Sequence, residues 1–270
     1  MQGTLSKMTT HLADVVEYAL PLGGERLALN PLIGKTVTLR FTGRILCDSC
    51  GRRTNRSFAQ GHCYPCMKKL AACDLCIMKP ETCHFHLGTC REPEWGERHC
   101  MINHVVYLAN TSDLKVGITR ESQVPTRWMD QGATQALPIF RARTRQLSGL
   151  LEVALAETIA DKTNWRTLLK GDNEAIDLAE RGAEAAAGVM DSTVALRRRF
   201  GDDAVERLKA KVVEIRYPVT VYPQKIRSLN FDKNPTVEGT LIGIKGQYLI
   251  FDTGVINIRK FTGYEIDTRA

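Results

Sequence analysis

Residues 47–66 read CDSCGRRTNRSFAQGHCYPC, and this stretch determines how the first half of the chain is organised. It contains two Cys-x2-Cys pairs, Cys47/Cys50 and Cys63/Cys66, with a linker of 12 residues between them. Each pair can present two thiolates to one tetrahedral ion, and the linker allows the pairs to converge. We therefore predict a zinc ribbon, in which these four cysteines close a structural zinc site.

A second group of thiols follows, and all nine cysteines lie between residues 47 and 100. Five thiols are present where a tetrahedral ion needs four ligands. We predict a second structural zinc ion, bound by Cys76, Cys83, Cys90 and Cys100. Alternatives for one of these ligands are Cys73, His86 and His104. The sequence thus predicts two zinc ions and does not decide the second ligand set.

Composition and charge limit the classes of protein to consider. The chain is 43% hydrophobic and 25% charged, as in ordinary globular proteins. It has no apolar run of the roughly 18–20 residues that span a bilayer, and its first residues lack a signal-peptide pattern. We expect a cytoplasmic protein with reduced thiols and no membrane partner.

The positive charge is concentrated in the first part of the chain. Residues 1–170 carry 22 Lys+Arg against 15 Asp+Glu, and residues 171–270 carry 15 of each. The basic half fits either a polyanion-binding face or a solvated surface.

The periodicity of apolar residues predicts an α+β protein with five segments. Residues 1–46 have strand character, 47–103 form the cysteine-rich zinc region, and 104–170 form a small α/β core. Residues 171–210 are expected to be helical, and 211–270 show short strands with glycine turns that predict a small β-barrel. Phe41-Thr42-Gly43 recurs as Phe261-Thr262-Gly263, so the two ends of the chain could pair in that barrel.

The core segment has a specific order of elements. A predicted hairpin (104–109 and 114–119) precedes a short helix with Arg127, a strand at 137–142 and a helix from Gln146 to Asp161. With Val105-Val106-Tyr107 and Lys115-Val116-Gly117 as its two motifs, residues 103–170 resemble the GIY-YIG nuclease family. Lys115 stands where that family has its second tyrosine, and the first motif lacks the family's glycine.

The resemblance implies a nuclease site in this segment. Arg127 would bind phosphate, Glu152 would hold a divalent Mg²⁺ or Mn²⁺ ion, and Tyr107 would position water or transfer a proton. Lys115 could bind phosphate or act as a base. These residue types suit the chemistry, because arginine grips phosphate bidentately and Mg²⁺ prefers carboxylate oxygen. By helical spacing, Glu157 could reach the same cleft as Glu152.

Basic side chains in both regions are candidates for contacts with nucleic acid, either DNA or RNA. In the zinc ribbon linker they are Arg52 and Arg53. In the core they are Lys115, Arg120 and Arg127. All could equally be solvated surface residues.

A second resemblance covers nearly the full length of the chain. The stretches 88–97, 104–109, 115–120, 127–133 and 161–166 are similar to domain-of-unknown-function family 2797. This second resemblance brings no established activity with it. We expect a zinc-containing, nucleic-acid-associated protein with a GIY-YIG-like core, for which the first resemblance implies metal-dependent phosphodiesterase activity. The alternatives are a non-catalytic DNA- or RNA-binding protein and a zinc-stabilised protein-interaction scaffold.

Overall fold

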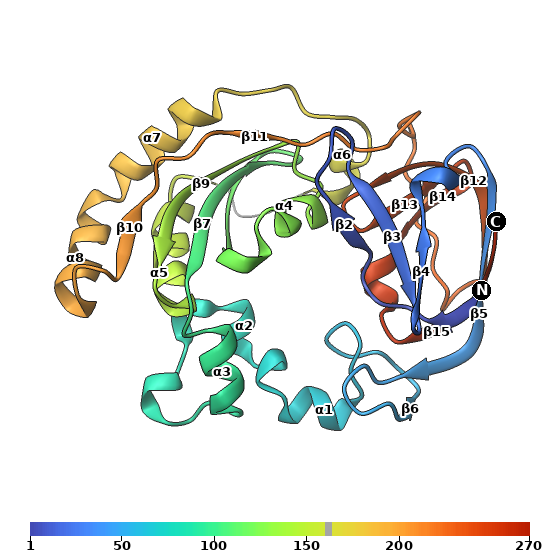
Figure 1. Ribbon diagram of the computed structural model, residues 1–270, viewed down its shortest axis with the longest axis horizontal. Helices are drawn as coiled ribbons and strands as arrows, with labels where there is room; N and C mark the ends of the chain where they lie inside the picture. The colour runs from blue at the N-terminus through green and yellow to red at the C-terminus, as the bar shows by residue number, and fades with distance from the viewer. Residues whose placement is uncertain (160–163) are drawn as a thin grey trace.

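Three β-sheets organise this computed structural model, which describes residues 1–159 and 164–270 (Figure 1). The architecture is mixed α+β. A core sheet with helices lies at the upper left of Figure 1, and a sheet made from both ends of the chain lies at the right. The cysteine-rich region lies below and joins the two. In this view α4 lies between the core sheet and β2, which it contacts.

The core sheet has the strand order β10-β9-β7-β8, and β11 also pairs with β9. Its central strand, β7, is buried along its whole length because it has neighbours on both edges. β7 and β8 form the antiparallel hairpin in the stretches where the sequence predicts one. The strands are β7 (His104–Asn110), β8 (Leu114–Arg120), β9 (Gln135–Ala142), β10 (Val205–Arg207) and β11 (Val213–Glu214).

Alternate residues of β7 pack into two different hydrophobic cores, because successive side chains of a strand point to opposite faces of the sheet. Val106 and Leu108 pack with the apolar side chains of the helices that cover one face. Tyr107 is buried on the other face with Trp128 and the side chains of the two remaining sheets. The helices of this part are α4 (Thr126–Asp130), α5 (Arg145–Ala156), α6 (Trp165–Leu168), α7 (Leu178–Gly188) and α8 (Met190–Phe200), with the 3₁₀ turn η5 (Glu121–Gln123).

Helix α5 begins at a capped end and stops earlier than the sequence suggests. The Thr144 hydroxyl accepts a hydrogen bond from the Leu147 N–H at 3.3 Å and so satisfies one free donor of the first turn. The helix ends at Ala156, whereas the apolar spacing predicts helix to Asp161. Residues 160–163 lie outside the described residues, and the end of that predicted helix and part of the stretch 161–166 lie there too.

The terminal sheet combines the two ends of the chain in the order β1-β15-β5-β12-β13-β14, and β6 pairs with β5. Gln2 lies opposite Asp267, and Leu39 lies between Val237 and Thr268. The strands are β1 (Gln2–Thr4), β5 (Thr36–Leu46), β6 (Arg53–Thr54), β12 (Thr236–Lys245), β13 (Tyr248–Phe251), β14 (Gly254–Asn257) and β15 (Tyr264–Arg269), and the 3₁₀ turn η6 (Ile258–Phe261) precedes β15.

The predicted small β-barrel is wrong, because this sheet is open in the described part of the chain. Backbone of other segments lies beside part of each outer strand. Beside β14, the Val255 N–H donates to the Arg227 carbonyl and the Leu229 N–H donates to the Val255 carbonyl. Beside β1, the Gly23 N–H donates to the Thr4 carbonyl. These hydrogen bonds satisfy part of each edge without closure of a barrel.

A small third sheet, β2-β3-β4, packs its apolar side chains into the same core as the terminal sheet. Its strands are β2 (Thr9–His11), β3 (Glu17–Leu22) and β4 (Glu25–Ala28), and η1 (Asn30–Leu32) follows. The cysteine-rich region consists of short helices and 3₁₀ turns: α1 (Tyr64–Lys69), η2 (Ala71–Cys73), α2 (Leu75–Met78), η3 (Pro80–Thr82), η4 (Phe85–Leu87) and α3 (Pro93–His99).

The cysteine-rich region is attached at both ends. Its first half packs on the terminal sheet, where Gly61 lies so close to Thr262 that a Cβ would approach the Thr262 methyl to 2.9 Å. Its second half docks on α5, where a Cβ on Gly149 would lie 2.5 Å from the Cβ of Pro80. The Arg145 Nη2 also donates to the Ile77 carbonyl at 2.7 Å. The region thus bridges the core and the terminal sheet, which also pack directly against each other in one hydrophobic cluster.

Candidate metal centre and the adjoining basic cleft

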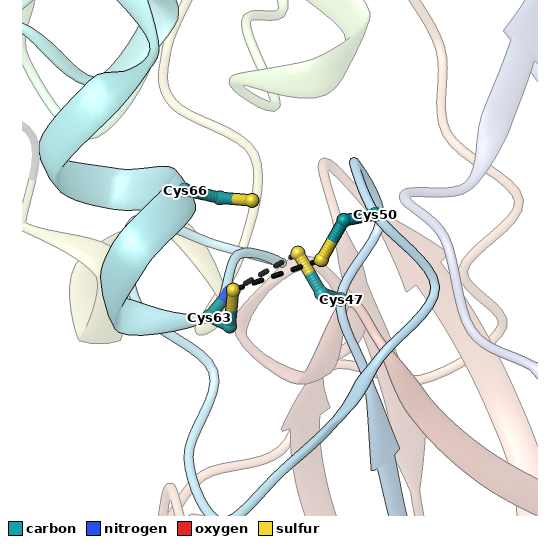
Figure 2. A group of neighbouring side chains, drawn as sticks. All are labelled: Cys47, Cys50, Cys63 and Cys66. Atoms are coloured by element: carbon teal, nitrogen blue, oxygen red, sulfur yellow. Dashed lines mark hydrogen bonds between the residues drawn. The ribbon is translucent and has the colours of Figure 1, made fainter.

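The four cysteines of the predicted ribbon meet at one point (Figure 2). Cys47 follows β5 and Cys50 lies in the next turn, whereas Cys63 caps α1 and Cys66 lies in its first turn. Their Sγ atoms all lie within 4.8 Å of one another, and those of Cys50 and Cys63 are 3.8 Å apart. A tetrahedral zinc with Zn–S bonds of about 2.3 Å requires sulfurs about 3.8 Å apart. This cluster can therefore hold a metal ion such as zinc.

The backbone around this cluster favours thiolate. The Cys63 N–H donates to the Cys47 sulfur at 3.2 Å. Burial acts to raise the pKa of Cys47, but N–H groups of Cys63, Cys50 and Ser49 outweigh it and lower that pKa to about 6. The pKa of Cys66 is raised to about 12, chiefly by its hydrogen bond with Cys63. Cys47 is thus ready to ionise, and a cation at the centre would offset the rise in the pKa of Cys66.

The second predicted ligand set stays a prediction, because among the described residues its four sulfurs do not all lie within 4.8 Å of one another. Cys76, Cys83, Cys90 and Cys100 nevertheless line one small cavity of about 20 Å³. Burial raises the pKa of Cys76 to about 11, and the charges of Asp74 and then the other three thiols add to this rise. The spare thiol, Cys73, does not line the cavity, nor does the exposed His86.

Asp74 and His84 also reach this cavity, and the sequence predictions missed them. Their ligand atoms lie within 4.8 Å of each other and of the Cys76 sulfur. Asp74 already forms an ion pair with Arg91, whose Nε lies 2.6 Å from the Asp74 Oδ2. The signal that could have found them is adjacency, because Asp74 lies inside the third Cys-x2-Cys pair and His84 follows Cys83. His104, the other predicted alternative, is buried at the start of β7, and its Nδ1 lies 2.8 Å from the Ile102 carbonyl oxygen.

The two motifs of the core hairpin face one another. Tyr107 pairs with Gly117 across β7 and β8, and a Cβ on Gly117 would lie 2.8 Å from the Tyr107 hydroxyl oxygen. That hydroxyl is buried and donates to the Gln131 Oε1 at 2.8 Å. Burial raises the pKa of Tyr107 to about 12, although the neighbouring Arg127 guanidinium lowers it and the Glu152 carboxylate raises it further. The hydroxyl therefore remains protonated at neutral pH.

The remaining predicted core residues lie in different surroundings. Lys115 is buried opposite Ala109 in the hairpin, so its side chain does not face solvent. Glu152 is half-buried on α5, two helical turns after Arg145 and thus on the same side of the helix. Glu157, the alternative carboxylate, is exposed just beyond the end of α5.

A basic cleft of about 420 Å³ opens where the three parts of the molecule meet. We call it the central cleft. Among the described residues its charged lining consists of five cations and one carboxylate: Lys7, Arg120, Arg127, Arg145, Arg259 and Asp130. Asp130 is already paired, because its carboxylate accepts from the Lys7 Nζ at 2.7 Å and from the Gln247 Nε2 at 2.8 Å.

The cations of the central cleft influence each other. Burial lowers the pKa of Arg145; Cys100 and Glu152 partly offset this effect, and the positive charge of Arg127 adds to it. Burial also lowers the pKa of Arg259, and the positive charge of Arg127 adds to the decrease. A phosphate group in the cleft would relieve this repulsion.

The predicted nucleic-acid contacts separate into two groups. Arg120 and Arg127 both line the central cleft, with Lys7 and Arg259 as partners that the sequence predictions missed. Arg52 and Arg53 are exposed on the ribbon and do not line it. The Arg52 side chain instead hydrogen-bonds the Cys50 sulfur, which raises the pKa of the guanidinium.

Comparison with known families identifies the class to which the chain belongs. The model of the family described as protein of unknown function (DUF2797) matches residues 34–266, so the chain belongs to this family. The matched range includes both cysteine groups and the core hairpin. No curated protein and no solved structure matches the chain. Within the described residues, no helix combines the length and apolar character needed to cross a membrane.

Proposed function

We propose that this chain is a zinc-stabilised nucleic-acid-binding protein that holds the phosphate backbone in its central cleft. The observation that carries the proposal is the charge of the cleft, where five cations outnumber one carboxylate, which is paired with one of them, Lys7. Such an excess of positive charge in a recess attracts a polyanion. Arg120 and Arg127 come from the core and Arg259 from the terminal sheet.

Zinc has a structural role in this proposal. Cys47, Cys50, Cys63 and Cys66 would bind one ion, and Cys76, Cys83, Cys90 and Cys100 would bind a second. Each set would supply all four ligands and leave no open position for substrate. The ions would instead stiffen a region of short helices, which joins the terminal sheet to α5 and forms one wall of the cleft.

Salt-dependent binding tests the proposal. We expect the purified chain to bind DNA or RNA at low salt, with an affinity that falls steeply as salt rises. For single strands, Arg120→Gln and Arg127→Gln should each reduce the slope of log K against log salt by about 0.7, one phosphate contact each. Arg198→Gln, on the exposed face of α8, is the matched control and should leave the slope unchanged. Absence of binding to any nucleic acid at low salt would overturn the proposal.

A second candidate function is a divalent-metal-dependent phosphodiesterase of GIY-YIG type. The observation in its favour is that Tyr107 lies against Gly117, with Arg127 beside its hydroxyl and Glu152 within electrostatic reach. In that function Glu152 would hold Mg²⁺ or Mn²⁺ and Arg127 would bind the phosphate. Two features favour binding without catalysis: Tyr107 is fully buried, and its raised pKa makes it a poor base at neutral pH.

The two functions differ in their response to one substitution. Glu152→Gln should abolish any Mg²⁺- or Mn²⁺-dependent cleavage of single-stranded, double-stranded or structured substrates, and it should leave binding within about twofold. If the wild-type chain leaves all these substrates intact with either ion, the phosphodiesterase candidate is rejected and the binding function is unaffected.

A further inference from the structure

The central cleft has an aromatic wall in addition to its cations. Trp95 and His99 lie four residues apart on α3, and both line the cleft. Their rings are stacked, with centroids 4.2 Å apart and planes inclined by 6°. The His99 Nδ1 lies 2.9 Å from the Trp95 carbonyl oxygen, which restrains the imidazole in this position. The wall is therefore held in place before any ligand arrives.

The aromatic wall and the cations come from different parts of the chain. α3 belongs to the cysteine-rich region, Arg120 and Arg127 to the core, and Arg259 to the terminal sheet. The combination of flat aromatic surface and positive charge is the one that binds unpaired nucleic acid, because bases stack on the rings while cations hold the phosphates. A purely structural stack would not need to border a basic recess.

The size of the recess favours an unpaired strand. A cavity of about 420 Å³ falls within the range of about 300–1,000 Å³ in which proteins hold small organic ligands. In a duplex both faces of a base are covered by its neighbours, so that base cannot meet the aromatic wall unless it leaves the stack. A base in a single strand needs no such step.

We propose that the central cleft is a binding site for single-stranded nucleic acid, in which one unpaired base stacks on the Trp95–His99 wall. The adjoining phosphates contact Arg120, Arg127 and Arg259. This inference rests on the proposed nucleic-acid-binding function and adds the strandedness of the ligand and the residues that recognise the base. A free nucleotide shares the same chemistry, so the experiment must separate it from a strand.

Tryptophan fluorescence reports directly on the aromatic wall. Trp128 is buried, and Trp165 stacks on Tyr248, so Trp165→Phe leaves Trp95 as the tryptophan accessible to a ligand. The full-length, zinc-loaded Trp165→Phe chain is titrated with a single-stranded oligothymidylate or oligouridylate of about ten nucleotides. Parallel titrations use a duplex of the same length and thymidine or uridine monophosphate. We expect saturable quenching by the single strand, with affinity at least about tenfold above that for the duplex and the mononucleotide.

Substitution of the wall provides the second arm. Trp95→Leu removes the ring and keeps an apolar side chain, and it should weaken single-strand binding about tenfold or more while duplex binding changes little. This effect is measured by fluorescence anisotropy of labelled strands, since the variant lacks the reporter. Zinc content and the unfolding midpoint show whether the variant is folded. If it is not, the quenching and strand-selectivity measurements on the Trp165→Phe chain still decide the question.

The outcomes separate this inference from the function on which it rests. Single-strand binding that neither quenches Trp95 nor responds to Trp95→Leu would refute the stacking site and leave the proposed function intact. Equal or tighter binding of the duplex would refute the assignment to single strands. Mononucleotide binding as tight as that of the strand would identify a small-nucleotide site instead. Failure to bind any of these probes would overturn both proposals.

Discussion

Gly117 lies directly opposite Tyr107 in the β7–β8 hairpin, and a Cβ at Gly117 would come within 2.8 Å of the tyrosine hydroxyl oxygen. The ring of Tyr107 therefore occupies the space that a side chain on the partner strand would fill. The hydroxyl then reaches Gln131 at the end of α4, so one glycine allows β7 to connect to the segment that carries Arg127.

We expect Gly117→Ala to destabilise the chain by about 1–3 kcal/mol, because the added methyl forces the buried ring of Tyr107 to move. Urea unfolding monitored by circular dichroism measures the change. Gly24→Ala is the matched control, since nothing lies within 4 Å of a Cβ placed there. That substitution should change the free energy of unfolding by less than about 0.5 kcal/mol. Equal effects of the two substitutions would contradict the packing described here.

The first metal centre is tested by Cys63→Ser. This substitution removes one thiolate from the tetrahedral set, so the metal content of the purified chain should fall by one zinc ion. The free energy of unfolding should fall by several kcal/mol, because the free energy of metal binding contributes to folding. Atomic emission spectroscopy on dialysed protein gives the stoichiometry, and a Cys63→Ser chain that retains the wild-type zinc content would disprove the assignment.

The second ligand set is tested by comparing Cys83→Ser with Cys73→Ser. Cys83 lines the small cavity with Cys76, Cys90 and Cys100, whereas Cys73 does not. We expect Cys83→Ser to reduce the zinc content from two ions to one and Cys73→Ser to leave it at two. The same measurement on Asp74→Asn and His84→Gln shows whether these neighbouring residues replace one thiol. Loss of zinc from the Cys73→Ser chain would identify Cys73 as a ligand.

Acid should destabilise the chain in part through His104. Burial lowers the pKa of this imidazole from 6.5 to about 4, and the charges of Arg145 and Arg120 act in the same direction. Because the unfolded chain binds the proton more readily, the stabilising contribution of His104 is complete above pH 6.5. It decreases as the pH falls toward 4, by up to about 3 kcal/mol.

The variant His104→Leu isolates this contribution from that of the other titrating groups. Urea unfolding of the wild-type and variant chains between pH 7 and pH 5 measures how steeply each loses stability. We expect a flatter pH dependence for the variant. Parallel curves for the two chains would show that His104 does not titrate in this range.

The local features of the candidate site could be predicted from the sequence. The relative position of the two thiols in a Cys-x2-Cys pair is set locally, because a turn or the first turn of a helix places both thiols on one side. The sequence predictions identified Cys47, Cys50, Cys63 and Cys66, and the structure places their sulfurs within 4.8 Å of one another. The β7–β8 hairpin was predicted in the same way, since its pattern of apolar residues and its polar turn are contiguous in the sequence.

Features that depend on distant segments could not be predicted. Parts of the edges of the terminal sheet are covered by residues near Arg227 and Gly23, and nothing in the strand pattern showed that the sheet stays open. Tyr107 was predicted as a catalytic residue, and only the packing of the terminal sheet and the third sheet against the core shows that its ring is buried.

The sequence by itself determined the ribbon cysteines, the hairpin and the basic character of the first 170 residues, because each depends on residue type and short spacing. Only the tertiary structure decided which side chains lie in the same cleft. Lys7, Trp95, Arg127 and Arg259 are far apart in the chain, and they line one cleft because the core, the terminal sheet and the cysteine-rich region pack against one another. Contacts of this kind come from packing between separate elements, for which short-range sequence patterns carry no signal.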